Sequence, residues 1–171
     1  MQGLGSKKRS GHDWKVKASS DNKKAHFQPH NRPLRAAVVI PAFNEAHRIA
    51  DSLKPVLNAS LVNEVIVVSD GSTDATVAIA REFEGVRVVD LPFNVGKGGA
   101  MCAGVAHTDA DVIAFIDADL IGLRPNHVDQ IIRPLLAGQC DMCIGVFRGG
   151  KFWSDTGQVI TPFLSGQRAM Y

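Results

Sequence analysis

The 171-residue sequence has few cysteines, few aromatic side chains and no long apolar run. Its three cysteines are an odd number, and no apolar core of a secretory signal is present, which favours free thiols in a reducing compartment over a disulfide-stabilised secreted domain. No run reaches the roughly 18 to 20 apolar residues that a transmembrane helix needs. We therefore expect a cytoplasmic protein that contacts a membrane only peripherally, if at all.

The scarcity of aromatic residues bears on whether the basic N-terminal segment binds nucleic acid. Residues 1–35 carry nine Lys and Arg against two Asp, whereas residues 36–171 are mildly acidic, so a basic tail precedes an acidic domain. Trp14 and Phe27 are the only aromatics in the tail, too few to stack nucleic-acid bases, and nucleic acid is not an expected partner. The tail also has too few apolar residues to offset the entropy of ordering, so we expect residues 1–35 to be disordered.

Two of the cysteines, Cys140 and Cys143, form a C-x-x-C pair. A structural zinc site needs two further ligands, and no second C-x-x-C or suitably spaced His pair supplies them. The sequence therefore favours buried cysteines in a strand over a metal or redox centre.

From residue 36 onward, short Val- and Ile-rich runs alternate with helical patterns. Continuous apolar strands separated by helices indicate an α/β fold with a mostly parallel central sheet flanked by helices on both faces. We expect right-handed crossovers between the strands. The expected strands are 36–40, 64–70, 86–91, 111–117 and 140–147. The expected helices are one carrying Ile49, Leu53 and Leu57 that Pro55 kinks or splits, one over 72–85, one from Lys97 to about His107, and one from Pro125 to Leu136.

Polar and glycine-rich residues follow the first four of these strands. In such sheets ligands bind at the carboxyl ends of the strands, near the point where the strand order reverses. The four segments that should meet there are PAFNE (41–45), DGSTD (70–74), NVGKGG (94–99) and DADL (117–120).

Asp117 and Asp119 are the clearest candidates for chemistry. In an extended segment residues i and i+2 project to one side, so both carboxylates should point into the same crevice. Oxygen ligands suit Mg²⁺ or Mn²⁺, which also take phosphate oxygens and can neutralise a departing diphosphate. The alternative is a pair of solvent-exposed aspartates that merely end a strand.

The segment NVGKGGAM (94–101) combines glycines, a helix start and Lys97, which together favour an anion. It matches neither the phosphate loop of nucleotide-binding proteins nor the dinucleotide fingerprint, and it can instead be a turn that needs glycine for its backbone. Asp70 can accept a hydrogen bond from a base or a ribose, while Ser72, Thr73 or Asp74 can cap the following helix.

The first loop leaves a similar choice open. Pro41 fixes the exit from the first strand, and Asn44 and Glu45 can cap a helix or bind a ligand. A nucleotidyltransferase of related fold would carry a glycine- and arginine-rich loop here, and PAFNEAHRI has no glycine.

In their order and spacing, VVIPAFNE, VIVVSDGSTDAT, NVGKGGAM and FIDADL resemble the donor-binding half of family 2 glycosyltransferases, including their dolichyl-phosphate mannosyltransferase and glucosyl-3-phosphoglycerate synthase members. The resemblance covers roughly residues 36–125. It implies a Rossmann-like GT-A fold for residues 36–171, a UDP- or GDP-sugar donor, a divalent metal (Mg²⁺ or Mn²⁺), and transfer to an acceptor such as a lipid phosphate or a small phosphorylated molecule.

The resemblance also implies roles for individual residues. Asp117 and Asp119 would be metal ligands, and Gln167 and Arg168 would lie on the acceptor side. The donor would contact Pro41, Phe43, Glu45, Val68, Asp70, Lys97, Gly98, Asp117, Ala118 and Arg148. Family members continue beyond SGQRA with more of the acceptor side, so no general base is assigned. A nucleotide-sugar-binding module without catalysis is the alternative.

Overall fold

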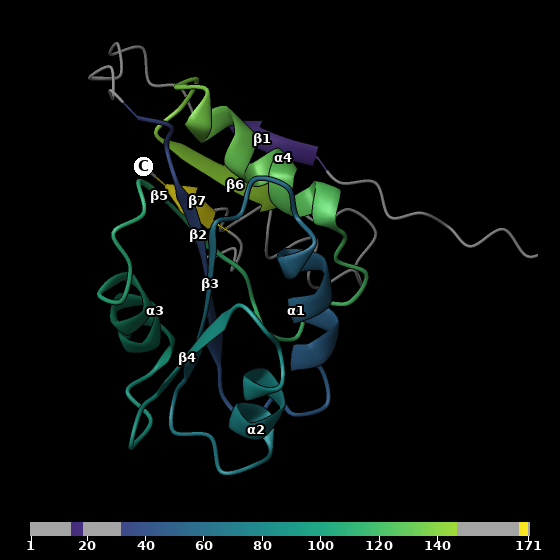
Figure 1. Cartoon of the computed structure of the whole chain (residues 1–171), viewed down its shortest axis with the longest axis vertical. Helices are drawn as coiled ribbons and strands as arrows, with labels where there is room; N and C mark the ends of the chain where they lie inside the picture. The colour runs from purple at the N-terminus through teal and green to yellow at the C-terminus, as the bar shows by residue number, and fades with distance from the viewer. Residues whose placement is uncertain (1–14, 19–31, 147–167, 171) are drawn as a thin grey trace, which may run out of the picture.

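The computed structural model describes residues 15–18, 32–146 and 168–170 (Figure 1). Its strands are β1 (Lys15–Ala18), β2 (Ala36–Ala42), β3 (Glu64–Ser69), β4 (Val86–Asp90), β5 (Val112–Phe115), β6 (Met142–Val146) and β7 (Arg168–Met170). Its helices are α1 (Ile49–Leu57), α2 (Thr76–Arg81), α3 (Lys97–Val105) and α4 (Pro125–Leu136). None of these helices has the length and apolar character needed to cross a membrane.

The strands form one mixed sheet in the order β1-β6-β7-β5-β2-β3-β4. β5, β2, β3 and β4 are mutually parallel, which confirms the mostly parallel α/β sheet that the sequence predicts. β7 lies between β5 and β6 and is antiparallel to both. After building β2, β3 and β4 outward, the chain returns to place β5 on the other side of β2, so the strand order reverses between β2 and β5.

Within residues 1–35, which the sequence predicts to be disordered, Lys15–Ala18 form the strand β1. Lys15–Ala18 pair antiparallel with β6, residue by residue from Lys15 opposite Val146 to Ala18 opposite Cys143. Backbone hydrogen bonds to a strand edge do not require apolar periodicity, which is why composition missed this strand.

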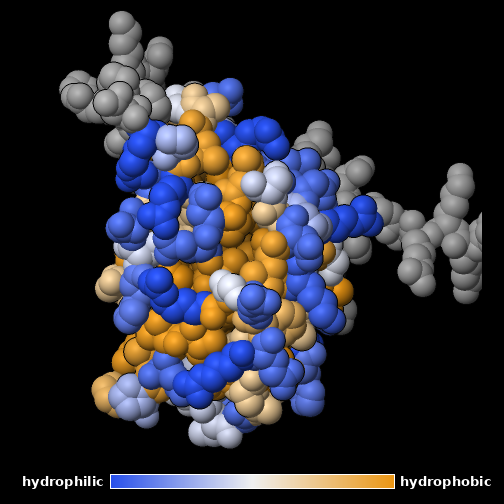
Figure 2. All heavy atoms as spheres, viewed as in Figure 1, coloured by the Kyte–Doolittle hydropathy of each residue, from blue (hydrophilic) through white to orange (hydrophobic). Residues whose placement is uncertain are grey.

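The core has one layer on each face of the sheet, because successive strand residues point to opposite sides. In β2, Val38 and Ile40 pack with α1, α2 and α4, whereas Ala37 and Val39 pack with α3. Figure 1 shows α3 alone on one side of the sheet and the other three helices on the opposite side. In the same view, Figure 2 shows apolar residues along the middle of the molecule with polar residues on both flanks.

The helices follow the predicted apolar patterns with two differences. In α1, Ile49 and Leu53 are fully buried as expected, and the helix continues through Pro55 to Leu57 without being split. In α4, Pro125 stands at the first turn, and the predicted stripe is buried except for the partly buried Leu136. α2 is shorter than the predicted 72–85 at both ends, because residues 72–74 contact the loop after β2 and residues 82–85 form a turn that ends at Gly85, with a φ of +82°.

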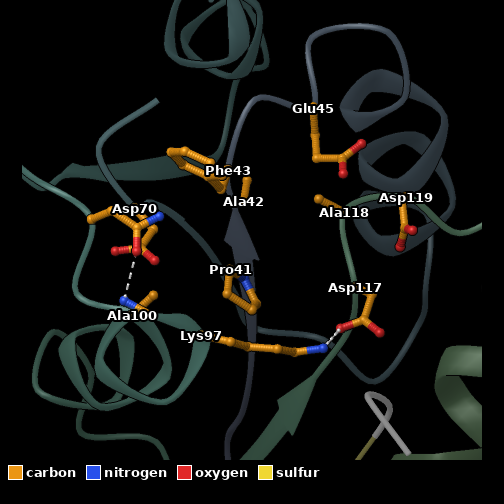
Figure 3. A pocket seen from close by; sticks show the side chains of 12 residues that line it. Pro41, Ala42, Phe43, Glu45, Asp70, Lys97, Ala100, Asp117, Ala118 and Asp119 are labelled. Atoms are coloured by element: carbon orange, nitrogen blue, oxygen red, sulfur yellow. Dashed lines mark hydrogen bonds and ion pairs between the residues drawn. The ribbon is translucent and has the colours of Figure 1, made fainter. Parts of the chain in front are cut away.

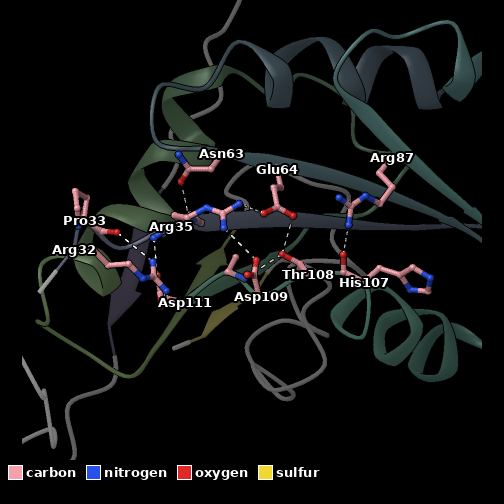
Figure 4. Close-up of polar contacts among 12 residues, drawn as sticks. Arg32, Pro33, Arg35, Asn63, Glu64, Arg87, His107, Thr108, Asp109 and Asp111 are labelled. Carbon is pink, nitrogen blue, oxygen red and sulfur yellow. Dashed lines mark hydrogen bonds and ion pairs between the residues drawn. The ribbon is translucent and has the colours of Figure 1, made fainter. Parts of the chain in front are cut away.

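Charged residues at the amino ends of the parallel strands pair with one another (Figure 4). The Arg32 guanidinium donates to both carboxylate oxygens of Asp111, at 2.9 and 3.0 Å. The Arg35 guanidinium donates to Glu64, and it also donates to Asp109 at 3.1 Å. These contacts hold the segment before β2 against the loop before β5. At the carboxyl ends, by contrast, acidic side chains outnumber basic ones around the cavity described below.

Candidate functional site

A cavity of about 430 Å³ opens at the carboxyl ends of the parallel strands, where the strand order reverses (Figure 3). The pairing of β2 with β5 ends at Val39 and Phe115, whereas β2 continues to Ala42 with β3 as its partner. Beyond that point the chain after β5 turns away and the crevice begins. All four predicted loops contribute to its lining, which consists of Pro41, Ala42, Phe43, Glu45, Asp70, Asn94, Gly96, Lys97, Ala100, Asp117, Ala118 and Asp119.

The first loop is held in place by the second. Asn44 has a φ of 56°, in the left-handed region, and its side-chain oxygen accepts the N–H of Thr73 at 2.8 Å. The N–H of Asn44 donates to the hydroxyl of Ser72 at 3.1 Å, and the N–H of Glu45 donates to that of Thr76 at 2.8 Å. Asn44 is therefore structural, and Glu45 is left at the cavity wall.

Ser72, Thr73 and Asp74 do not cap α2 as the sequence predicts. Its N-cap is Ala75, without a side-chain cap. Asp74 instead accepts the N–H of Ala46 at 3.1 Å and both the hydroxyl and the N–H of Thr76. The hydroxyl of Thr76 makes the largest contribution to lowering the pKa of Asp74, and these N–H groups add to it. The polar run after β3 thus positions the loop after β2.

Asp70 joins the second loop to the third. Its side chain is only 4% exposed, and one carboxylate oxygen accepts the N–H of Val95 at 2.7 Å. Gly71, with a φ of +70°, lets the third loop approach, because a Cβ there would lie 2.7 Å from the backbone nitrogen of Asn94. Asp70 therefore lines the cavity and also anchors the loop that leads to α3.

The third loop delivers the start of α3 to the cavity. Gly96 precedes the helix with a φ of +84°, and its N–H donates to the side-chain oxygen of Asn94 at 3.0 Å. Lys97 is the first residue of α3 and lines the cavity. First-turn N–H groups of a helix have no intrahelical acceptor and carry partial positive charge, so this end of α3 favours an anion.

Asp117 and Asp119 both line the cavity, but the extended geometry predicted for them is wrong. β5 ends at Phe115, and residues 118 and 119 form a turn. The buried Ser52 of α1 holds this turn by donating its hydroxyl to the carbonyl of Ala118 at 2.9 Å. The directions of the two carboxylates are therefore set by this turn and not by the alternation of side chains along a strand.

Each of these two aspartates pairs with a different cation. The Lys97 ammonium lies 2.5 Å from a carboxylate oxygen of Asp117, and Figure 3 shows the Lys97 side chain extending across to this carboxylate. A guanidinium nitrogen of Arg48 lies 3.9 Å from an oxygen of Asp119.

The cavity lining has an excess of three negative charges, from Glu45, Asp70, Asp117 and Asp119 against Lys97. Within the described residues, no group of three or more His, Cys, Asp or Glu side chains is arranged to hold a metal ion. Two carboxylates do suit Mg²⁺ or Mn²⁺, because these ions bind one or two protein carboxylates and complete their shell with water and substrate phosphate oxygens. The lining therefore fits a divalent ion that arrives with a phosphate ligand.

Most of the predicted site residues meet at this cavity. Val68 does not line it, because its side chain is fully buried beneath α3, and Gly98 lies exposed outside it. Arg148 and Gln167 lie outside the described residues. The backbone of Arg168 lies in β7, opposite Phe115 and Ile144. The cavity is also lined by Ala42, Asn94, Gly96 and Ala100, which lie within the four motifs but carry no individual signal in the sequence.

Cys140 and Cys143 are buried free thiols and are not among the residues that line the cavity. Burial is the main cause that raises both pKa values, that of Cys143 to about 11. The predicted burial of both cysteines is confirmed, but only Cys143 lies in a strand, because β6 begins at Met142, after Cys140.

Comparison with known proteins identifies the family. The model of Glycosyl transferase family 2 matches residues 37–157. Glucosyl-3-phosphoglycerate synthase of Mycobacterium tuberculosis is 39% identical over 113 residues, which are 60% of this chain and 34% of that protein. The 4,4'-diaponeurosporenoate glycosyltransferase of Staphylococcus aureus is 39% identical over 100 residues, which are 56% of this chain and 26% of that protein.

Solved structures of one of these relatives also match the fold of this chain. The M. tuberculosis glucosyl-3-phosphoglycerate synthase in complex with uridine diphosphate matches with a TM-score of 0.65 and 31% identity, over 80% of this chain and 56% of that one. Its complex with Mn²⁺, UDP-glucose and phosphoglyceric acid matches with a TM-score of 0.63. This chain spans about a third or less of the length of the two relatives and just over half of the solved chain. The family model covers well over half of this chain, which therefore belongs to glycosyl transferase family 2.

Proposed function

We propose that this domain binds a nucleoside-diphosphate sugar together with a divalent cation and transfers the sugar to a phosphorylated acceptor. The observation that carries the proposal is the composition of the cavity, in which an acidic lining surrounds one ammonium group and the start of a helix. The relative whose complex contains Mn²⁺, UDP-glucose and phosphoglyceric acid supports the same set of ligands.

The nucleoside end of the donor would lie beside Asp70. This carboxylate is held rigidly by the N–H of Val95, so it offers a fixed acceptor for a base N–H or a ribose hydroxyl. Phe43 is 48% exposed at the cavity wall and presents an apolar surface to a base or ribose, with Pro41 beneath it. Val68, which is buried beneath α3, would support this pocket by packing and would not contact the donor.

The diphosphate would lie between the start of α3 and the Asp117–Asp119 turn. Two negative phosphates entering a lining that is already acidic would be repelled, by about 4 kcal/mol for a pair of unit charges 4 Å apart near a protein surface. A bound divalent ion neutralises this charge and the charge that grows on the diphosphate as the sugar leaves. Asp117 and Asp119 would hold the ion, while Lys97 and the N–H groups of α3 would orient the phosphates.

The acceptor side is proposed from the relatives. The M. tuberculosis complex contains phosphoglyceric acid together with UDP-glucose, which favours a small phosphorylated acceptor here. Arg168 and Gln167 stay predictions for that side, as does Arg148 for the donor phosphates. A cytoplasmic location with peripheral membrane contact also stays a prediction.

A panel of nucleotide sugars tests the proposal. Thermal unfolding of the chain is measured with UDP- and GDP-sugars, with and without Mn²⁺. A ligand at one hundred times its Kd stabilises the folded state by about 2.7 kcal/mol, so the true donor gives the largest Mn²⁺-dependent shift. Asp119→Asn should abolish the metal dependence. Asp109→Asn, which makes the same charge change at the opposite end of the sheet, should leave it intact.

Sugar transfer is then measured with the donor so identified and phosphorylated acceptors. Product that forms with Mn²⁺ and not after chelation supports the enzyme. Donor binding without transfer or donor hydrolysis, for every acceptor offered, would leave a binding module and refute the transferase.

A further inference from the structure

Arg48 is a charged residue at the cavity rim that none of the sequence motifs singles out for a function. It is the N-cap residue of α1 and directly follows the loop after β2. Its guanidinium lies 3.9 Å from Asp119, and the two side chains are 53% and 50% exposed. Arg48 itself is not part of the cavity lining.

The pair that Arg48 makes is weak. A nitrogen-to-oxygen distance of 3.9 Å exceeds that of a hydrogen bond, so the attraction is an ion pair between half-exposed groups. Such pairs contribute about 0 to 1 kcal/mol. Arg48 can therefore leave Asp119 at little cost, unlike Lys97, which lies within hydrogen-bond distance of the less exposed Asp117.

A divalent ion on Asp119 changes what surrounds Arg48. The ion takes the carboxylate as its ligand and repels the neighbouring guanidinium, because both are positive. The same event brings diphosphate oxygens to the cavity. A guanidinium presents five N–H donors in a planar fork and stays charged at all relevant pH values, which suits it to phosphate.

The position of Asp119 indicates which phosphate Arg48 would meet. In Figure 3, Asp70 and Asp119 lie at opposite sides of the cavity, with Lys97 and Asp117 between them. A donor whose nucleoside lies at Asp70 therefore extends its distal phosphate and sugar toward Asp119. This is the end beside which Arg48 stands.

We propose that Arg48 is a donor-binding residue that exchanges partners. Without ligands it holds Asp119 and partly neutralises it. When the metal and the diphosphate bind, Arg48 leaves Asp119 and donates to the distal phosphate. This inference rests on the proposed function, because it takes the nucleoside diphosphate and the divalent ion as the ligands of the cavity.

The exchange predicts two effects of opposite sign in Arg48→Gln. Mn²⁺ alone should bind about two to three times more tightly, because a competing cation has been removed from Asp119. UDP at saturating Mn²⁺ should bind about tenfold more weakly, because a charge-assisted hydrogen bond to the distal phosphate is lost. UMP, which lacks that phosphate, should bind as it does to the wild type.

Lys54→Gln is the matched control. It removes the same charge from the exposed surface of the last turn of α1, six residues away. Arg48→Lys is the second variant. It keeps the charge near Asp119 and loses the fork, so Mn²⁺ affinity should stay close to the wild-type value while UDP binds more weakly. Mn²⁺ affinity is measured by electron paramagnetic resonance and nucleotide affinity by calorimetry, on chains with wild-type thermal unfolding.

Three results would overturn the inference. Arg48→Gln can match Lys54→Gln in both affinities, which makes Arg48 an ordinary surface charge. Both affinities can fall together, which makes its role in the loop structural. UMP can lose as much affinity as UDP in Arg48→Gln, which shows that Arg48 does not act on the distal phosphate. A wild-type chain that binds neither Mn²⁺ nor any nucleotide would instead refute the proposed function itself.

Discussion

Two glycines of α3 should respond in opposite ways to the same substitution. A Cβ at Gly104 would meet the side chains of Val39 and, at 3.1 Å, Val68. Both valines are fully buried in the central strands, so they cannot move aside. A Cβ at Gly98 would find no atom within 4 Å. Gly104→Ala therefore pushes α3 away from the sheet, and Gly98→Ala adds only a methyl group in solvent.

The expected sizes follow from two opposing contributions. Overpacking a filled core costs about 1–3 kcal/mol, and replacing a helical glycine by alanine returns about 0.5–1 kcal/mol. The contact with Val39 is closer than real Cβ contacts, which places Gly104→Ala in the upper part of the overpacking range, at about 2–3 kcal/mol. With about 1 kcal/mol returned by the alanine, Gly104→Ala should lower the free energy of unfolding by about 1–2 kcal/mol. Gly98→Ala should raise it by about 0.5 kcal/mol, at the low end because the residue lies in the first turn. For a domain of this size, 1 kcal/mol corresponds to roughly 3–5 °C in Tm.

Thermal and urea unfolding of the two variants beside the wild type check this prediction. Gly104→Ala should melt roughly 3–10 °C below the wild type, and Gly98→Ala slightly above it. Equal Tm values for Gly104→Ala and Gly98→Ala would refute the close approach of α3 to β2 and β3. The position that this packing gives to Lys97 would be refuted with it.

Three further predictions concern buried groups. Ser52→Ala should weaken Mn²⁺-dependent UDP binding several-fold, because the turn at Ala118 loses its hydroxyl donor, while unchanged affinity would show that the turn holds itself. Burial and, secondarily, Arg124 lower the pKa of His127 to about 4. As the pH falls, the unfolded chain binds this proton before the folded chain does. The His127 contribution to stability is therefore present above pH 6.5 and falls between pH 6.5 and 4. If the free energy of unfolding of His127→Gln depended on pH as that of the wild type does, this would be contradicted. A thiol reagent at pH 8 should label Cys102 in the folded chain and leave the buried Cys143, with its raised pKa, unlabelled until unfolding, and native labelling of Cys143 would disprove its burial.

The parallel sheet and the position of the cavity could be predicted because they depend on local patterns. Runs such as 36–40 are apolar at every residue, which indicates a strand buried on both faces, and Val38 and Val39 do point to opposite core layers. Polar residues follow each strand because the strand ends are where backbone and side chains meet solvent. The rule that parallel strands share their carboxyl edge then places the loops together.

Contacts between loops could not be predicted in this way. Asp74 reads in sequence as a helix cap, and besides the nearby Thr76 it accepts the N–H of Ala46, which lies 28 residues away in another loop. The turn at Ala118 depends on Ser52, which is 66 residues distant and looks like any polar residue within a helix. The family resemblance implies a donor contact for Val68, and only the packing of α3 shows that this side chain is buried. β1 and β7 are short strands whose pairing depends on edges that no local pattern reveals.

Metal-coupled nucleotide binding at the Asp117–Asp119 turn is the central property proposed for this domain. The decisive measurement is the calorimetric affinity of UDP, with saturating Mn²⁺ and with chelator, for the wild type, Asp119→Asn and Asp109→Asn. We predict that Mn²⁺ strengthens UDP binding at least tenfold in the wild type and in Asp109→Asn, and has little effect in Asp119→Asn. Equal strengthening in all three chains would show that the cavity described here does not hold the metal and the diphosphate together.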